Sequence, residues 1–139
     1  MFSTRIATQI YAKICFETTL GQKKIIEKLS EYLAGDDFSR IFVLNGYAGT
    51  GKTTLIAALV GALKDLNIKP ILLAPTGRAA KVLAQYAQEK AFTIHKRIYR
   101  QRTNADYESK YSLNFNAEKG AVFIVDEASM LSDLSLIHI

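Results

Sequence analysis

The chain has 139 residues, of which 49% are hydrophobic and 22% charged, and its formal net charge is +5. This length allows one globular domain with a sizeable core, and the balanced composition excludes a disordered or low-complexity protein. The single cysteine, Cys15, excludes an internal disulfide and a cysteine-based metal site, which favours a reducing, cytoplasmic location.

The first 35 residues are predicted to form two helices. Apolar residues recur at helical spacing from Ile6 to Ile14 and again from Ile25 to Leu33. Gly35, followed by two aspartates, is expected to end the second helix. Gln9 and Lys13 interrupt any signal-peptide core, and no run approaches the roughly 20 apolar residues of a membrane span. We therefore expect a protein that is neither exported nor embedded in a membrane.

A strand, a glycine-rich loop and a helix are predicted next. IFVLN (Ile41–Asn45) is a short apolar run rich in strand formers, and it leads directly into the glycines. The helical pattern TTLIAALVGALKDL follows. This order is typical of a buried parallel strand that feeds a loop and a helix.

A second strand and helix follow between Pro70 and Lys90. ILLA (Ile71–Ala74) is the predicted strand, and Pro75 closes it. Thr76 can cap the helix in TGRAAKVLAQYAQEK. The residues of that helix expected to face inward are Val82, Leu83 and Tyr86.

The last predicted elements are a short helix, an irregular region and a third strand. Thr93 is a candidate cap for the helix in TIHKRIY, and residues 100–120 are predicted to be a loop or an irregular hairpin. AVFIV (Ala121–Val125) is the third buried strand. Strands that alternate with helices predict an α/β fold with a doubly wound parallel sheet. The functional loops should then lie at the carboxyl ends of the strands.

The final residues, LSLIHI (Leu134–Ile139), do not fit this pattern. They are what CTGTCTCTTATACACATC encodes, which resembles the end of a transposon-derived sequencing adapter. We therefore expect one domain over residues 1–133 and a non-native tail over residues 134–139. The alternative is the start of a genuine apolar strand.

The run LNGYAGTGKTT (Leu44–Thr54) has the pattern of a phosphate-binding loop. Gly46, Gly51, Lys52 and Thr53 fill G-x-x-x-x-G-K-[ST] between a predicted strand and a predicted helix. Backbone N–H groups of such a loop point at phosphate oxygens, and the helix dipole adds to the attraction. We expect Lys52 to reach the β- and γ-phosphates and the Thr53 hydroxyl to bind Mg²⁺; a glycine-rich turn with an exposed lysine is the alternative. The predicted nucleotide-binding residues of the loop are Gly46, Ala48, Gly49, Thr50, Gly51, Lys52, Thr53 and Thr54.

Two acidic residues end the third strand, in VFIVDEAS. Hydrolysis of a nucleotide needs a carboxylate on the metal and a group that orients water. Asp126 is the candidate for the metal and Glu127 for the general base. The alternative for Asp126 is a capping role at a helix start.

Basic residues concentrate between positions 78 and 102. This stretch contains seven basic residues and one acidic residue, Glu89. Its local charge is therefore +6, in a chain whose net charge is +5. Such a block is often only a solvated face. Here Arg78 and Lys81 stand beside a helix start that exposes the N–H groups of Thr76 and Gly77, which suits a nucleic-acid phosphate.

Taken together, four segments carry a family resemblance. GYAGTGKTT, APTGRAAKVL, TIHKRIY and IVDEASM, in this order, resemble motifs I, Ia, Ib and II of superfamily 1B DNA helicases, in the RecD-like and Dda-like group. The resemblance runs from about residue 19 to 132. It implies the parallel sheet of a RecA-like P-loop NTPase, with ATP and Mg²⁺ as cofactors and single-stranded DNA as partner.

The resemblance also implies residue roles. TTLGQKKII resembles the upstream Q motif, which implies that Gln22 reads the adenine; a solvated glutamine at a helix start is the alternative. His95, taken without the family, is more often a surface or helix-cap residue. The positions implied to contact single-stranded DNA are Pro75, Thr76, Gly77, Arg78, Thr93, His95 and Lys96.

The family uses a second RecA-like domain, which supplies arginine fingers and the other half of the DNA track. None of the motifs of that domain occurs in these 139 residues. We therefore expect this chain to be the ATP-binding half of a 5′–3′ DNA helicase in recombination or repair, with the direction and pathway implied by the resemblance only. By itself it should hydrolyse ATP very slowly, because an arginine finger can be worth about 10³- to 10⁵-fold in rate.

Two other functions stay open from the residues. A small-molecule or nucleotide kinase would use the same loop with an acceptor pocket and an arginine-rich lid, for which the 100–120 segment is a candidate. The acidic pair after the third strand argues instead for water as the acceptor. A nucleotide-gated binding module without turnover is the other alternative, and Glu127 argues against it.

Overall fold

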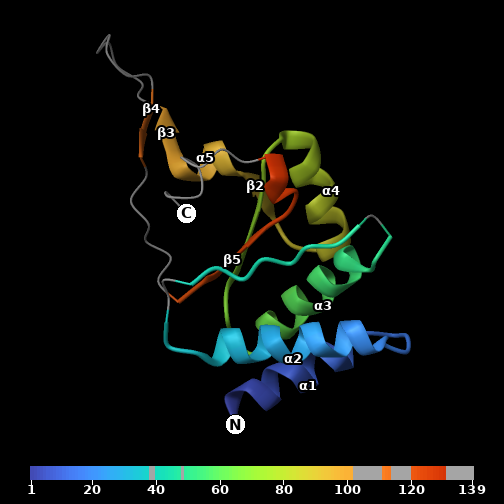
Figure 1. Ribbon diagram of the computed structural model, residues 1–139. Coiled ribbons are helices and arrows are strands. Elements are labelled where there is room, and N and C mark those ends of the chain that lie inside the picture. Colours follow the sequence, from blue (N-terminus) through green and yellow to red (C-terminus); the bar gives the residue numbers. More distant parts are fainter. Residues whose placement is uncertain (38–39, 48, 102–110, 114–119, 131–139) are drawn as a thin grey trace. The chain divides into compact units, whose positions relative to one another are not determined.

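The computed structural model describes residues 1–37, 40–47, 49–101, 111–113 and 120–130 (Figure 1). The chain divides into two units, Met1–Ile68 and Lys69–Ile139. Ala48, from the predicted phosphate loop, and the suspected adapter-derived residues 134–139 lie outside the described ranges.

Helices α1 (Phe2–Lys13), α2 (Leu20–Ala34) and α3 (Lys52–Asp65) build the first unit. Helix α1 packs against both α2 and α3. The apolar positions at helical spacing form the shared core, and the fully buried residues among them include Ile6, Ile10, Ile26 and Leu63. The two predicted N-terminal helices are therefore confirmed, and the second ends with Gly35 as its C-cap residue, as expected.

A glycine allows the close contact between α1 and α3. The aliphatic stem of Lys13 lies over Gly61, where an added Cβ would be 3.3 Å from Lys13 Cδ. The Lys13 ammonium then reaches Asp65 Oδ2 at 2.7 Å. Both side chains are partly exposed, so the ion pair adds little stability, and the packing of the stem over Gly61 is the larger contribution.

The predicted strand at Ile41–Asn45 is wrong, because residues 40–47 make no strand pairing. The burial of side chains still alternates along the segment, and Phe42 and Leu44 are half-buried. Ile41 and Val43 are 72% and 79% exposed. A strand depends on hydrogen bonds from a neighbouring strand, which a local apolar run cannot provide.

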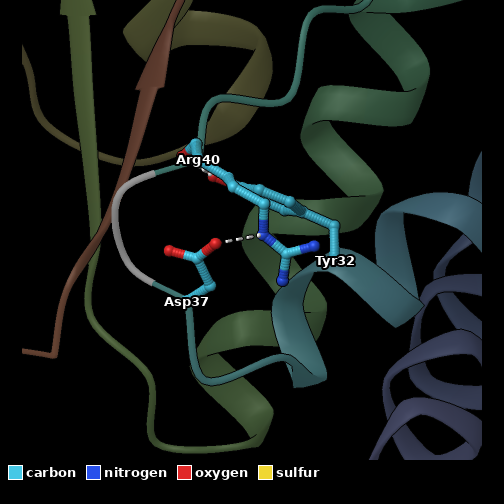
Figure 2. Close-up of polar contacts among 3 residues, drawn as sticks. All are labelled: Tyr32, Asp37 and Arg40. Atoms are coloured by element: carbon cyan, nitrogen blue, oxygen red, sulfur yellow. Dashed lines mark hydrogen bonds and ion pairs between the residues drawn. The ribbon is translucent and has the colours of Figure 1, made fainter.

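Helix α2 holds the start of this segment instead (Figure 2). The Tyr32 hydroxyl donates to the backbone carbonyl of Arg40 at 2.7 Å. The Tyr32 ring lies 5.5 Å from the ring of Phe42. Arg40 Nε also pairs with Asp37 Oδ2 at 3.2 Å. These contacts tie the chain that leads into the glycine-rich loop to the helix before it.

A parallel sheet forms the centre of the second unit. Its strand order is β2 (Ala91–Thr93), β1 (Pro70–Ala74), β5 (Val122–Val125), and β1 is parallel to both neighbours. The predicted parallel α/β arrangement and its strands at 71–74 and 121–125 are thus confirmed. The third strand is β2, which the sequence analysis did not identify.

The central strand is buried on both faces, which explains its continuous apolar run. Ile71 and Leu73 form a cluster with Ile94, and Phe92, Phe123 and Val125 pack against it. Helix α4 (Gly77–Ala87) packs against β1 and β2. Because side chains alternate along a strand, Leu72 and Ala74 point to the face opposite the Ile71 cluster.

Helix α4 buries a narrower stripe than predicted. Ala80, Leu83 and Ala87 are its buried residues. Val82, which was expected to face inward, is 51% exposed, so that expectation is wrong. Positions 80, 83 and 87 follow one helical stripe, and residue 82 lies outside it.

The remaining elements of the second unit are short. Helix α5 (Ile94–Ile98) follows β2 directly, and 3₁₀ helix η1 (Ala128–Met130) follows the acidic pair. β3 (Tyr99–Gln101) pairs antiparallel with β4 (Tyr111–Leu113), which confirms a hairpin-like pairing within the predicted irregular region.

Among the described residues, no helix combines the length and apolarity that a bilayer crossing requires.

Adjacent residues of α4 test this core. Leu83 is fully buried, so we expect Leu83→Ala to lower the free energy of unfolding by about 2–5 kcal/mol. Val82→Ala removes two exposed methyl groups and should change it by less than about 0.5 kcal/mol. Urea denaturation followed by circular dichroism measures both. Equal losses for the two variants would contradict the described orientation of α4.

Candidate active site

The glycine-rich loop has the backbone of an anion-binding turn. Gly49 and Gly51 have φ angles of 79° and 85°, a left-handed conformation that glycine adopts without strain. Gly51 is the N-cap residue of α3, which begins at Lys52. Its lack of a side chain leaves the first N–H groups of that helix without a capping oxygen from the N-cap, and these groups carry the positive end of the helix dipole.

Lys52 is held inside this loop. Its ammonium donates to the backbone carbonyls of Gly46 and Tyr47, the second at 3.0 Å. The Thr50 hydroxyl donates to the same Tyr47 carbonyl at 2.7 Å. The cation is thus positioned by neutral acceptors, which a phosphate oxygen can replace with a stronger, charge-assisted bond.

Gly51 is restricted by its surroundings as well as by its φ angle. A Cβ at this position would lie 2.8 Å from the side-chain nitrogen of Gln22. At Gly46 an added Cβ would lie 3.0 Å from Thr50 Oγ1. Any other residue at position 51 would therefore have two costs, because it would strain the backbone and would also displace the Gln22 side chain.

Gln22 lies between the start of α2 and this loop. Its side-chain oxygen accepts the backbone N–H of Thr19 at 3.0 Å, and its backbone N–H donates to Thr19 Oγ1 at 3.2 Å, which together form a capping box. Its side-chain nitrogen lies beside Gly51, 2.8 Å from the position that a Cβ would take there. Gln22 therefore has the role at a helix start that was the alternative to adenine recognition. A role in reading adenine stays a prediction.

Thr53 and Thr54 are exposed on the first turn of α3. The Thr53 hydroxyl is therefore accessible to a metal ion. Hydroxyl and carboxylate oxygens are the hard ligands that Mg²⁺ prefers, so the donor types at Thr53 and Asp126 fit this ion.

The acidic pair follows β5, and Asp126 is fixed by contacts to three other residues. Its N–H donates to the Leu73 carbonyl at 3.0 Å, which extends the pairing of β5 with β1. Its Oδ1 accepts the Glu127 N–H at 3.0 Å, and its Oδ2 accepts the Tyr86 hydroxyl at 2.6 Å. Both oxygens of the predicted metal ligand are thus engaged.

Tyr86 is the site residue that sequence reasoning assigned only to the core. It is half-buried on α4, and burial is the largest cause that raises its pKa. The hydrogen bond to Asp126 and the negative charges of Asp126 and Glu127 raise the pKa further. The phenol therefore stays protonated at neutral pH and remains a donor to the carboxylate.

Glu127 has an unusual backbone. Its φ angle is 54°, in the left-handed region, although it is not a glycine, and its side chain is exposed. Such residues cost roughly 1–3 kcal/mol and cluster at functional sites. Met130 N–H donates to the Glu127 carbonyl at 3.1 Å, which helps to hold this turn.

The residues implied to contact DNA gather at one edge of the parallel sheet. Pro75–Arg78 follow β1, while Thr93 is the last residue of β2 and His95 and Lys96 lie just after it. Asp126, the predicted metal ligand, follows β5 at the same edge. The carboxyl ends of neighbouring parallel strands meet at the same edge, so three separate sequence motifs are brought together there.

Two of these residues act as helix caps. Thr76 Oγ1 accepts the Ala79 N–H at 3.2 Å, and Thr93 Oγ1 accepts the Lys96 N–H at 3.3 Å, so both predicted caps are confirmed. Arg78, His95 and Lys96 are exposed. Arg97 lies over the Phe92 ring at 5.6 Å, which fixes one cation of the basic block beside β2.

Comparisons with known proteins agree with these features. The profile of a family described as AAA domain matches residues 19–139. The ATP-dependent RecD2 DNA helicase of Deinococcus radiodurans is 32% identical over 104 residues, which is 72% of this chain and 13% of the relative. The ATP-dependent DNA helicase dda of Enterobacteria phage T4 is 45% identical over 53 residues, 37% of this chain and 12% of the relative. The chain thus spans about an eighth of the length of these relatives.

The loop geometry predicts a specific effect of Gly51→Ala. The added Cβ would be strained at φ 85° and would meet Gln22, so we expect nucleotide affinity to fall roughly 10-fold or more. Titration of a fluorescent ATP analogue, followed by anisotropy, measures this. Gly21→Ala is the matched control, because its Cβ would be 3.9 Å from Thr19 Oγ1. Unchanged affinity of Gly51→Ala would show that this loop does not hold the nucleotide.

Proposed function

This chain belongs to the AAA-domain family, in its group of RecD-like and Dda-like helicases, and we propose that it is the ATP-binding motor domain of a 5′–3′ DNA helicase. The observation that carries the proposal is the convergence of three motifs at one sheet edge, at the ends of β1, β2 and β5. The left-handed glycines before α3 support nucleotide binding independently.

The first unit supplies the phosphate-binding function. The N–H groups of the loop and of the α3 N-terminus would bind phosphate oxygens, and Lys52 would exchange its carbonyl partners for the β- and γ-phosphates. Thr53 and Asp126 would hold Mg²⁺. When bound, the ion neutralises charge that develops on the phosphates.

Glu127 would orient the water that attacks the γ-phosphate. Its side chain is exposed and therefore accessible to a water molecule, and its left-handed backbone is of the kind found at functional sites. Asp126 is instead held in one orientation by hydrogen bonds to both carboxylate oxygens, and the remaining lone pairs of these oxygens suit a metal ion at a fixed position. The two adjacent carboxylates thus divide the work of metal binding and water activation.

Single-stranded DNA is the proposed partner of the β1 and β2 ends. The start of α4 offers backbone N–H groups beside the exposed Arg78, and Lys96 is exposed at the start of α5. Such groups contact the phosphate backbone without reading sequence. The net charge of +6 between residues 78 and 102 favours the same partner.

Larger features of the helicase are also proposals. The relatives are about eight times as long as the matched region, which supports a second RecA-like domain in the parent protein. That domain would supply the arginine finger that makes hydrolysis fast. A cytoplasmic role in DNA recombination or repair follows from the same proposal.

Replacing the proposed base tests this function in the full-length protein. Glu127→Gln keeps the shape of the side chain but cannot accept a proton, so we expect ATP turnover to fall about 10²- to 10⁴-fold while ATP binding is retained. Steady-state ATPase assays with and without single-stranded DNA measure the effect. A wild-type ATPase that single-stranded DNA does not stimulate would contradict the motor function. Stimulation by a small phosphate acceptor instead would indicate a kinase.

A further inference from the structure

Tyr86 makes a contact that the helicase motifs do not include. It lies in the last turn of α4, and its hydroxyl donates to Asp126 Oδ2 at 2.6 Å across 40 positions of sequence. Both residues are half-buried, so the hydrogen bond is shielded from competition with bulk water. The elements that carry the two residues belong to the same unit.

The contact completes the fixation of the Asp126 carboxylate. The β1 backbone holds the main chain of Asp126, the Glu127 N–H holds Oδ1, and the Tyr86 hydroxyl holds Oδ2. Without the hydroxyl, the Glu127 N–H would be the one remaining donor to this carboxylate among the described residues. A carboxylate that is to meet a metal ion in one orientation benefits from the second donor.

Helix α4 does not need this hydrogen bond for its own packing. Ala80, Leu83 and Ala87 already bury its face, and the helix packs against both β1 and β2. Helix α4 also begins with Gly77 and Arg78, two of the predicted DNA contacts, directly after the Thr76 cap. One short helix therefore carries two of the predicted DNA contacts in its first turn and the partner of the predicted metal ligand in its last turn.

We propose that Tyr86 is a positioning residue that orients Asp126 for Mg²⁺ and links the metal site to the DNA-contacting helix α4. This inference rests on the proposed function, because it takes Asp126 as the metal ligand and the start of α4 as a DNA contact. A shift of α4 on DNA binding would change the Tyr86–Asp126 hydrogen bond, because the hydroxyl that donates it is carried by this helix. The link predicts that DNA alters the Mg²⁺ requirement through this side chain.

The test compares two tyrosines in the full-length protein. Tyr86→Phe removes the hydroxyl beside Asp126. Tyr32→Phe is the matched control, since it removes a hydroxyl that donates at 2.7 Å to the Arg40 carbonyl (Figure 2). The readout is the Mg²⁺ concentration that gives half-maximal binding of a fluorescent ADP analogue.

We expect Tyr86→Phe to raise this Mg²⁺ concentration about 10-fold or more, as loss of a hydrogen-bond partner of a metal ligand usually does. Binding of the analogue in EDTA should not change in Tyr86→Phe. Because Tyr32 anchors the chain before the glycine-rich loop, Tyr32→Phe can weaken the analogue in EDTA and in Mg²⁺ alike, but its half-maximal Mg²⁺ concentration should be that of the wild type. An unchanged or lower Mg²⁺ requirement in Tyr86→Phe would overturn the positioning role.

The link to DNA has its own measurement. Single-stranded oligonucleotide should change the Mg²⁺ requirement of the wild type and of Tyr32→Phe, and this change should be lost in Tyr86→Phe. The same oligonucleotide effect in all three proteins would overturn the link. If instead the wild type lacks DNA-stimulated ATPase activity, the proposed function fails, while the Mg²⁺ titration still decides whether Tyr86 positions Asp126.

A spectroscopic measurement does not depend on how well the phenylalanine variant folds. 3-Fluorotyrosine incorporated at position 86 should show a ¹⁹F shift when Mg²⁺ is added to the ADP-bound protein, and the same label at position 32 should not. No Mg²⁺-dependent shift at position 86 would contradict the proposal.

Discussion

The parallel pairing of β1 with both of its neighbours is the constraint on which the second unit depends. The registers Leu73↔Val125 and Ala74↔Thr93 bring the ends of the three strands level with one another. The residues that follow those ends are therefore gathered without any contribution from the loops. The strands themselves are apolar and inert. They set the positions of the polar residues just beyond them.

Much of this arrangement could be predicted because its signals are local. The runs at β1 and β5 are apolar and bounded by turn residues, and helices α1 to α4 show apolar residues at helical spacing. Thr76 and Thr93 were identified as caps because a threonine before a helical pattern has one common role there. Where the physical cause lies within a few residues, sequence and structure agree.

Val82 was misassigned for a local reason, because it lies outside the stripe that α4 buries, but the other failures share a non-local cause. The run at 41–45 has the composition of a strand, but pairing needs a neighbour that composition does not specify. Strand β2 is only three residues long, and what defines it as a strand is its parallel pairing with β1. Tyr86 occupies an amphipathic helix, where an aromatic residue indicates core packing, and its hydrogen bond to Asp126 spans 40 positions. No window of sequence around Tyr86 contains that partner.

The glycine-rich loop of the first unit and the acidic pair of the second unit have different determinants. Among the described residues, the loop contacts named above come from residues 19–54, and they involve the glycines, Lys52, the first turn of α3 and the side chain of Gln22. The orientation of Asp126 instead depends on β1, on Glu127 and on a helix far away in sequence. The conformation of the glycine-rich loop thus depends on residues close to it in sequence, whereas the orientation of the Asp126 carboxylate is a tertiary property. Because the hydrogen bond from Tyr86 is a tertiary contact, the orientation of Asp126 depends on the position of α4.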